Sequence, residues 1–262
     1  MNNNYISIIL TVHNQENIIS SVLCGILDNI SSYVKELIII LDGCTDNSEK
    51  NIDKLLPKAK DKGLDIKIIF SNDINEVRAN NLGLKNSTCK YSIIVQDDCV
   101  ITEPNFDQRM LKPFLLLPNL MAVSGRDAVD VRVIQGRLDY YNCGGKDAGT
   151  AKNIFSIRDA VNRSPLMLDN DKVSRLNYLD EDFAPLDSDD VDLSIRGNKA
   201  FGYIVGSYVV DYDSPLHWGT TRSNPESARI WEASMIKNHQ LIVDRHYDFI
   251  TKNKFSHDMV IE

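Results

Sequence analysis

Hydrophobic residues in the first hundred positions alternate between two spacings. A near-continuous run of branched apolar side chains at 6–12 is typical of a strand that is buried on both faces of a parallel sheet. Apolar residues then recur at i, i+3 and i+4 between Ile18 and Ile30, which predicts an amphipathic helix with Asn14 as its cap. The chain therefore opens with a strand followed by a helix.

The same unit repeats along the next stretch. A second strand is predicted at 37–41. Asp46, with Glu49 three residues later, predicts the start of a helix that carries apolar side chains as far as Ala59.

Two more strands, at 66–70 and 91–95, enclose a shorter helix at 76–84. Four strand–helix units in a hundred residues predict an α/β fold, with an open, Rossmann-like, mostly parallel central sheet and helices on both faces. In such folds ligands bind at the carboxyl ends of the strands. The polar residues that follow each strand are therefore the first candidates for chemistry.

After about residue 120 the apolar runs become shorter, and no linker separates a second domain. We expect one domain over 1–262, whose last part, 226–262, is a packed helical extension. A glycine-rich patch at 142–150 is a candidate loop that closes over a bound ligand. An acidic stretch at 180–192 does not fit a calcium-binding loop, because the central glycine and the closing glutamate are missing.

The balance of charge narrows the function classes. The chain has 29 basic and 37 acidic residues, a net charge of −8, which disfavours a general binder of nucleic acid or of anionic membranes. Its five scattered cysteines, none in a C-x-x-C pattern, favour reduced, mostly buried thiols over a zinc or redox role. We find no signal peptide and no apolar run of about 18 residues, so we expect a cytoplasmic protein. Peripheral association of 226–262 with the inner face of a membrane is the less favoured alternative, because its polar positions carry mixed charges.

The turn after the first strand lacks the glycines that bind phosphate in other nucleotide-binding folds. A dinucleotide fold places G-x-G-x-x-G there, whereas residues 11–16 read Thr-Val-His-Asn-Gln-Glu. A diphosphate would have to be neutralised elsewhere, and a metal ion is the obvious substitute. Asp97 and Asp98 directly follow the fourth strand, and two adjacent carboxylates repel each other less when a divalent cation lies between them and a diphosphate. A solvated turn is the alternative for this pair.

Several segments, in the right order, resemble the GT-A glycosyltransferases of family 2, which transfer sugars from nucleotide diphosphate donors. The resemblance covers about residues 5–220, and no single segment decides it. The matching segments are IILTVHN at 8–14, LDGCTDNS at 41–48, RANNLGL at 78–84, QDD at 96–98, NRSP at 162–165 and SDDVDLSIR at 188–196.

This resemblance implies a GT-A fold and an enzyme. The implied reaction is metal-dependent, inverting transfer of a hexosyl group from a nucleotide-diphospho-sugar donor to a glycan or lipid-linked sugar acceptor, as in polysaccharide biosynthesis. Mn²⁺ or Mg²⁺ is the implied cofactor. The single domain would comprise a nucleotide-binding half, 1–100, an acceptor and catalytic half, 101–225, and the helical extension.

The residues that match the family's motifs take particular roles by this resemblance. Asp98 is the implied metal ligand, with Asp97 as its helper. His217 lies where many family members bring a histidine back to the metal, with a structural or surface histidine as the alternative. Arg78 is implied to approach the diphosphate or the base, with a solvated charge as the alternative. The residues implied to surround the base and ribose are Thr11, His13, Asn14, Glu16 and Asp42.

Inversion requires one general base that removes the proton of the acceptor hydroxyl. Asp190 is our candidate, because it lies just before the amphipathic pattern of Val191, Leu193 and Ile195, where a turn can point it into the cleft. Asp189 is its competitor, and a solvated acidic loop is the alternative for the whole stretch. Further candidates for contact with donor phosphate or acceptor sugar are Asn162, Arg163 and Trp218.

Three positions depart from the family's pattern. Leu41 and Gln96 stand where acids are expected, and Asp189 stands for a glutamate, so donor preference is open. A non-enzymatic member that binds a nucleotide sugar or a glycan is one alternative, motivated by Leu41 and Gln96. A nucleotidyltransferase of similar fold is another, disfavoured because the first strand is not followed by a basic, glycine-rich loop. No departure removes the metal carboxylate or the base, so we expect an active enzyme.

Overall fold

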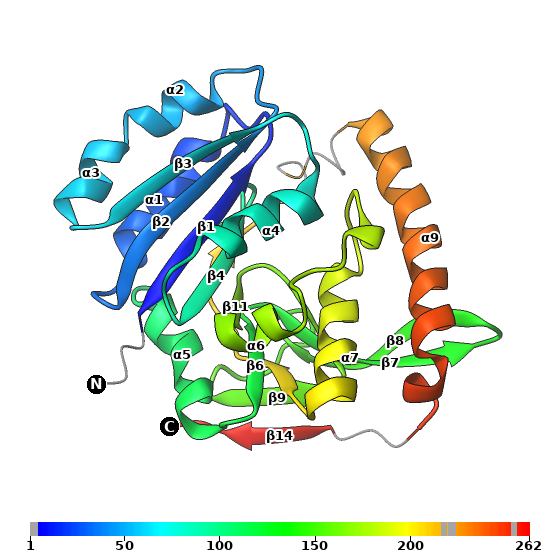
Figure 1. Cartoon of the computed structure of the whole chain (residues 1–262). Coiled ribbons are helices and arrows are strands. Elements are labelled where there is room, and N and C mark those ends of the chain that lie inside the picture. Colours follow the sequence, from blue (N-terminus) through cyan, green and yellow to red (C-terminus); the bar gives the residue numbers. More distant parts are fainter. Residues whose placement is uncertain (1–4, 216–218, 220–223, 253–255) are drawn as a thin grey trace.

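The computed structural model describes residues 5–215, 219, 224–252 and 256–262. Its strands are β1 Ile6–Val12, β2 Val34–Asp42, β3 Asp65–Ser71, β4 Tyr91–Gln96, β5 Val100–Ile101, β6 Leu120–Ser124, β7 Asp127–Ile134, β8 Arg137–Gly145, β9 Ile154–Arg158, β10 Ala160–Asn162, β11 Leu166–Asp169, β12 Ile204–Ser207, β13 Tyr212–Asp213 and β14 His257–Val260. Within these described residues, nine strands form one sheet in the order β14-β9-β12-β6-β11-β4-β1-β2-β3 (Figure 1). Smaller sheets are formed by β10-β7-β8 and by β13-β5.

Helices separate β1, β2, β3 and β4 in the sequence, whereas β6 to β11, which are described throughout, follow one another without a helix. The helices are α1 Ile19–Asn29, α2 Ser48–Asp53, α3 Leu56–Asp61, α4 Glu76–Asn86, α5 Phe106–Leu116, α6 Asn170–Arg175, α7 Asp189–Phe201 and α9 Pro225–Ile250, with the 3-10 helix η1 Glu181–Phe183.

The strands of the N-terminal units form the parallel core of the large sheet. β1 pairs in parallel with β2 on one side and with β4 on the other, and β2 pairs in parallel with β3. Successive side chains of a strand point to opposite faces, and both Ile8 and Ile9 of β1 are fully buried. Burial on both faces explains the unbroken apolar runs that predicted these strands.

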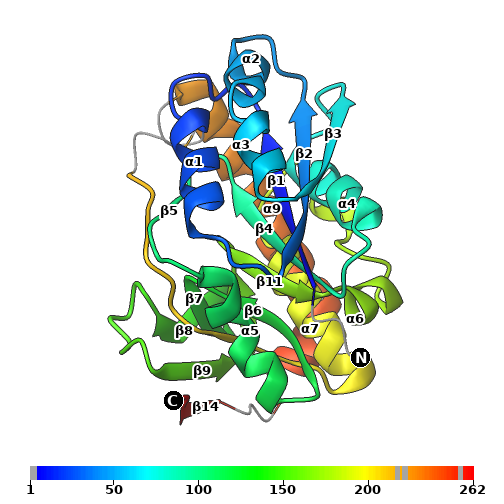
Figure 2. The same ribbon diagram turned by 90° about the vertical axis from the view of Figure 1, so that its left-hand side faces the viewer.

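Helices cover both faces of the sheet, as Figure 2 shows. One buried cluster joins Ile8 of β1 to Leu23 of α1 and Phe106 of α5. A second cluster joins Ile9, on the opposite face, to Val77 of α4 and Leu193 of α7. The two clusters are the cores of a layered α/β domain, and they hold β1 rigidly between them.

The second half of the chain extends the same sheet. β11 runs antiparallel between β4 and β6, so it joins the two halves. β12 is parallel to β6, whereas β9 and β14 are antiparallel to their neighbours. The predicted α/β fold with helices on both faces is confirmed, but the sheet is mixed: its core and the β12–β6 pair are parallel, and its other pairs are antiparallel.

A third cluster lies between α7, α9 and the β7–β8 hairpin. It contains Val131 of β7, Leu138 of β8, Ile195 of α7 and Ile242 of α9. Helix α9 runs alongside α7 and crosses the hairpin (Figure 1). In the part of the chain that the structure describes, no helix is both long enough and apolar enough to cross a membrane.

Two helix starts differ from the sequence prediction. Ile18, and not Asn14, is the N-cap of α1, because the Asn14 side chain instead accepts a hydrogen bond from the backbone N–H of Thr45 at 2.8 Å. The helix expected to start at Asp46 starts at Ser48 and is two short helices, α2 and α3. Pro57 lies in the first turn of α3, where its missing N–H is tolerated but where it cannot continue a preceding helix.

Two later expectations are also corrected. The glycine-rich patch is not a loop throughout, because its residues up to Gly145 belong to β8. The C-terminal extension is not wholly helical. Its helix ends at Ile250, and the chain then returns as β14, which pairs with β9 at the edge of the main sheet.

Glu36 is a buried carboxylate that ties three segments together at the amino end of the parallel core. It accepts hydrogen bonds from Ser7 of β1, from the backbone N–H and hydroxyl of Thr88, and from Lys67 of β3. Burial would raise the pKa of Glu36, but these hydrogen bonds outweigh burial and lower it to about 2.

We expect Glu36→Gln to destabilise the protein by about 2 kcal/mol at neutral pH, because a buried charge-assisted network is lost. The folded-state pKa lies below the unfolded one, so the stabilising contribution is present above pH 4.5 and is lost as pH falls toward 2. Urea unfolding at several pH values measures this. The difference in free energy of unfolding between wild type and Glu36→Gln should shrink in acid. Substitution of an exposed glutamate, Glu49→Gln, should leave the free energy of unfolding unchanged at every pH. A difference for Glu36→Gln that is independent of pH would contradict the assignment.

Candidate active site

The carboxyl ends of β1, β2 and β4 meet, and His13 joins them. Its backbone N–H donates to Oδ2 of Asp97 at 2.9 Å, and its ring Nδ1 lies 2.7 Å from the main-chain oxygen of Asp42. A carbonyl oxygen only accepts, so the bond places the ring proton on Nδ1. Two residues earlier, the hydroxyl of Thr11 donates to Oδ1 of Asn80 in α4 at 3.3 Å. Four residues predicted from sequence are therefore brought together here.

Asp42, at the end of β2, already uses both carboxylate oxygens within the fold. Oδ1 accepts hydrogen bonds from the hydroxyl of Ser71 and the N–H of Ile74, both at 2.8 Å, and Oδ2 accepts one from the N–H of Asn75 at 2.9 Å. These bonds hold the turn that leads from β3 into α4. A carboxylate has about four acceptor positions, so Asp42 keeps room for one more donor.

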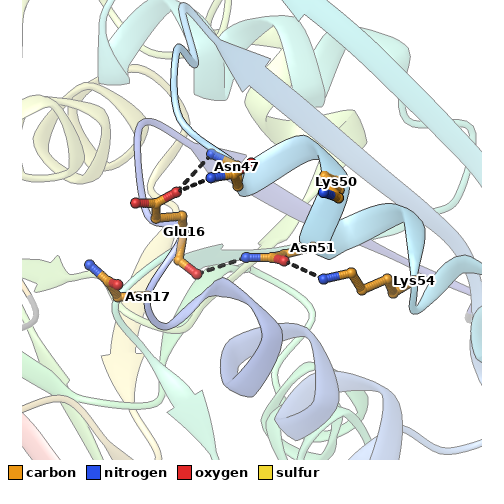
Figure 3. Close-up of a pocket in the computed structure, with 6 residues that line it drawn as sticks. All are labelled: Glu16, Asn17, Asn47, Lys50, Asn51 and Lys54. Carbon is orange, nitrogen blue, oxygen red and sulfur yellow. Dashed lines mark hydrogen bonds between the residues drawn. The ribbon is translucent and has the colours of Figure 1, made fainter.

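Asn14 and Glu16 fasten the turn after β1 to the turn after β2. The Glu16 carboxylate accepts hydrogen bonds from the backbone N–H of Asn47 at 3.0 Å and from its side-chain amide at 2.7 Å. Figure 3 shows Glu16 at one side of a polar pocket of about 290 Å³ between this turn and α2. The lining residues are Glu16, Asn17, Asn47, Lys50, Asn51 and Lys54, so the pocket does not include the aspartates at the ends of β2 and β4.

Asp97 and Asp98 directly follow β4, as expected. Burial raises the pKa of Asp97 to about 8, and the negative charges of Asp98 and Glu76 act in the same direction, against the hydrogen bond from His13. The acidic side chains at the end of β4 therefore disfavour one another's ionised forms, and a bound cation would offset that repulsion.

The donor set at this strand end fits Mg²⁺ or Mn²⁺. Both carboxylates are hard oxygen ligands, and such ions in nucleotide enzymes typically take one or two carboxylates and complete their shell with phosphate oxygens and water. Among the residues described, no three His, Cys, Asp or Glu side chains converge as a ready-made metal cage. His217, the second predicted ligand, and Trp218 lie outside the described residues.

A buried arginine, Arg163, is surrounded by three carboxylates, one from the start of α4 and two from the start of α7. Its Nη1 donates to Glu76 at 3.0 Å, its Nη2 forms an ion pair with Asp189, and its Nε lies 3.6 Å from Oδ2 of Asp190. Its backbone N–H also donates to Oδ2 of Asp190, at 3.0 Å. Burial opposes the charge of Arg163, but the three carboxylates outweigh it and raise the pKa of Arg163, so the guanidinium stays charged.

Glu76 connects this cluster to the end of β4. The same Oε1 atom that accepts from Arg163 also accepts from the side-chain amide of Gln96 at 3.1 Å. Burial raises the pKa of Glu76, and Arg163 opposes that shift. A continuous chain of contacts therefore runs from Gln96, beside Asp97, through Glu76 and Arg163 to the start of α7.

Asp190, the predicted base, lies in the first turn of α7. Its Oδ1 accepts the N–H of Val191 at 2.9 Å, and its side chain is 11% exposed. Burial raises its pKa to about 6, with a smaller contribution from Asp189 and against the attraction of Arg163. A carboxylate with a pKa near 6 is ionised at neutral pH and is a stronger base than an ordinary aspartate. Asp189, its competitor, is almost fully buried against Arg163.

A family model for glycosyl transferase family 2 matches residues 7–162, which include every strand end described above. The chain belongs to glycosyl transferase family 2. No curated protein gives a match.

Solved structures confirm the expected GT-A fold of this family 2 glycosyltransferase. S. aureus TarS 1–349 in complex with UDP is 15% identical, with a TM-score of 0.54 over 79% of this chain and 59% of that one. The mannosyltransferase PcManGT from Pyrobaculum calidifontis, in complex with GDP-Man and Mn²⁺, is 15% identical, with a TM-score of 0.57 over 86% and 64%. GalNAc-T7 with UDP, GalNAc and Mn²⁺ is 10% identical, with a TM-score of 0.61 over 79% and 44%. The chain thus spans between about two fifths and two thirds of the length of these proteins.

Two arginines that were predicted to contact the substrates instead form ion pairs with carboxylates of the glycosyltransferase itself. Arg78, expected near a diphosphate, forms an ion pair with Glu181 of η1 at 3.2 Å, with both side chains about half exposed. Arg163, expected to contact donor phosphate or acceptor sugar, is neutralised by its three carboxylates. Sequence reasoning missed Glu76. The only available signal was an acid in the first turn of the helix that carries the RANNLGL segment.

We expect Arg163→Met to destabilise the enzyme by about 3–5 kcal/mol at neutral pH, because it leaves buried carboxylates without an ion-pair partner. The pKa values of Glu76 and Asp190, already raised by burial, would rise further without Arg163, so the loss of stability should shrink as pH falls and these carboxylates become protonated. Chemical unfolding at about pH 7.5 and about pH 5 measures both effects.

Arg78→Met is the matched control. It removes an exposed ion pair, which is worth less than about 1 kcal/mol. Equal losses of unfolding free energy in the two variants would show that the charge of Arg163 does not stabilise the site.

Proposed function

We propose that this family 2 enzyme transfers a sugar, with inversion and with the help of Mn²⁺ or Mg²⁺, from a nucleotide diphosphate to a hydroxyl group of a glycan or lipid-linked acceptor. The observation that carries the proposal is the chain of contacts from Gln96 through Glu76 and Arg163 to Asp190. It links an acidic strand end, suited to a cation and a diphosphate, to a buried carboxylate suited to deprotonate an acceptor. The two chemical requirements of the reaction are thereby joined in one rigid unit.

The donor would lie at the carboxyl ends of β1, β2 and β4. Its base and ribose would face Thr11, His13 and Asp42, with Asn14 and Glu16 fixing the adjoining turn. Asp98, helped by Asp97, would hold the cation, which offsets the charge that develops on the leaving nucleoside diphosphate. The structures of TarS with UDP, of PcManGT with GDP-Man and Mn²⁺, and of GalNAc-T7 with UDP, GalNAc and Mn²⁺ support a nucleotide-sugar donor and a divalent cation as ligands.

The acceptor would approach from the side of α7. Asp190 would take the proton of its hydroxyl as the oxygen attacks the sugar carbon, opposite the leaving diphosphate. Arg163 holds this carboxylate from two directions, through its backbone N–H and its guanidinium. Asp189, bound to the same guanidinium, would keep Arg163 in place. We treat the whole of 1–262 as one catalytic domain in this proposal.

Asp98→Ala should lower donor turnover by at least about a hundredfold, the usual effect of removing one electrostatic stabiliser of a developing charge. The fold should survive, because the residue is a strand-end side chain outside the apolar cores. Release of nucleoside diphosphate from UDP-, GDP- and dTDP-sugars, and of CMP from CMP-sugars, with Mn²⁺ measures turnover. The Mn²⁺-dependent rise in melting temperature given by the preferred donor should also disappear.

The exposed Asp211→Ala is the control for that experiment and should keep both signals. Unchanged turnover in Asp98→Ala would contradict the metal assignment. Pyrophosphate as the product would favour nucleotidyl transfer, and donor binding without turnover would favour a binding-only member.

Asp190→Asn should lower kcat for transfer by about 10²–10⁴, the usual contribution of a general base, with little change in donor affinity. Because the carboxylate form is the active one and its pKa is about 6, wild-type kcat should rise with pH through about 6 to a plateau. Asp190→Asn should lack this acid limb. A larger loss of kcat in Asp189→Asn, with the acid limb intact in Asp190→Asn, would transfer the role to Asp189.

A further inference from the structure

Next to Asp190 lies a second polar cluster that the proposed chemistry leaves unused. It is made by Tyr140 of β8, His239 of α9, and Asp187 and Ser188 of the turn before α7. The Tyr140 hydroxyl lies 3.5 Å from Nε2 of His239, and the same nitrogen lies 3.7 Å from Oδ2 of Asp187. The two rings meet edge to face, with centroids 5.5 Å apart. Three elements remote in sequence thus converge on one polar spot.

The members of this cluster are bonded to one another unequally. The Ser188 hydroxyl donates to Oδ2 of Asp187 at 2.8 Å and also bonds Tyr140, whereas His239 is only loosely held. Hydrogen bonds between N–H and oxygen normally measure 2.7–3.2 Å, so the distances from His239 to its two partners leave donor and acceptor capacity unused. Tyr140 is 37% exposed, and the side chains of His239 and Asp187 are each 25% exposed. The cluster can therefore be reached by a ligand, and it offers one aromatic face, one imidazole edge and one carboxylate.

The cluster is held at a fixed place relative to Asp190. The side-chain amide nitrogen of Asn238, fully buried in α9, lies 2.8–2.9 Å from the main-chain oxygens of Phe183, Leu186 and Asp187, so its two N–H groups are shared among three acceptors. His246 of the same helix contacts Asp192 of α7 at 2.8 Å. Asp187 lies three residues before Asp190 in the chain. A molecule bound at Tyr140 and His239 would therefore be positioned by the same helix that fixes the base.

The charge of the cluster identifies the kind of ligand it suits. Burial lowers the pKa of His239 and raises the pKa of Tyr140, so both are neutral near pH 7. The remaining charge is the carboxylate of Asp187, with Asp189 and Asp190 beyond it. The nearby cation Arg163 is neutralised by carboxylates, and Lys237 of α9 donates to main-chain oxygens of the preceding loop. An anionic ligand would be repelled, whereas hydroxyl groups can both donate to Asp187 and accept from Tyr140 or His239.

We propose that Tyr140, His239 and Asp187 form the acceptor subsite, and that they recognise an uncharged sugar through its hydroxyl groups and select against phosphate-bearing acceptors. This inference rests on the proposed function, which it narrows to transfer onto a neutral glycan. The amphipathic ring of Tyr140 packs against the sugar's C–H face, and Asp187 accepts from its hydroxyls. A site built to bond a hydroxyl discriminates strongly against a ligand that lacks it.

Binding of simple probes to the whole chain tests the subsite without any turnover. The probes are methyl hexosides of the gluco, galacto, manno and N-acetylglucosaminyl series and the matching hexose 6-phosphates, observed by saturation-transfer NMR with UDP or GDP and Mn²⁺ present. At least one methyl hexoside should bind wild type, and its 6-phosphate should bind about tenfold more weakly. Tyr140→Ala and His239→Ala should each lose about tenfold in affinity, near the value of one well-made hydrogen bond.

Two further variants sharpen the comparison. Tyr247→Ala, an exposed tyrosine on the same helix, should bind like wild type. Asparagine is tolerated at position 187, where the backbone is left-handed. Asp187→Asn should therefore fold and should reduce the difference in affinity between the neutral sugar and its 6-phosphate. Binding of no methyl hexoside, or preference for the phosphates, would overturn the proposal.

Kinetics separates this inference from the proposed function. Donor hydrolysis without acceptor should stay within about twofold of wild type in Tyr140→Phe and His239→Ala, whereas the KM for the preferred acceptor should rise about tenfold with little change in kcat. A parallel fall of hydrolysis and transfer would show that the cluster only supports the loop of Asp190, and would overturn the subsite. If wild type turned over no donor, the proposed function would fail, and the binding experiment would still decide the subsite.

Discussion

A charge buried without a partner is too costly to keep in a protein interior, and in this molecule that constraint acts at Arg163. Its guanidinium is stable only because Glu76, Asp189 and Asp190 surround it, and each of those carboxylates is in turn tolerated only because of the guanidinium. The start of α4, the connection between β10 and β11 and the start of α7 therefore cannot shift independently. The acidic end of β4 is tied into the same unit through Gln96.

The parallel core could be predicted from sequence because its strands are buried on both faces and are therefore continuous runs of apolar residues. The mixed character of the sheet could not, since β11 and β14 are short and their pairing depends on contacts with distant segments. The predicted cap at Asn14 failed for a related reason. A side chain that can cap a helix can equally bond a neighbouring turn, and here the turn at Thr45 takes it.

The candidate site was predictable to the extent that topology alone decides it. Parallel strands bring their carboxyl ends together, so His13, Asp42 and Asp97 had to be neighbours once the strands were recognised. The ion pair between Glu76 and Arg163 was not predictable, because it is a contact between residues 87 positions apart. The same is true of the cluster at Tyr140, whose members come from a hairpin, a turn and a late helix.

The hydrogen bonds from α9 to the turn before α7 also determine the order in which parts of the chain fold during synthesis. Asn238 follows Phe183 by 55 residues, so at ~5–20 residues per second the turn is made roughly 3 to 11 seconds before the side chain that fastens it. The strands that bind the nucleotide in our proposal lie in the first hundred residues and can pair earlier. A nascent chain would thus complete its donor half first and gain an ordered catalytic loop only when α9 has emerged, which delays chemistry until the fold is nearly whole.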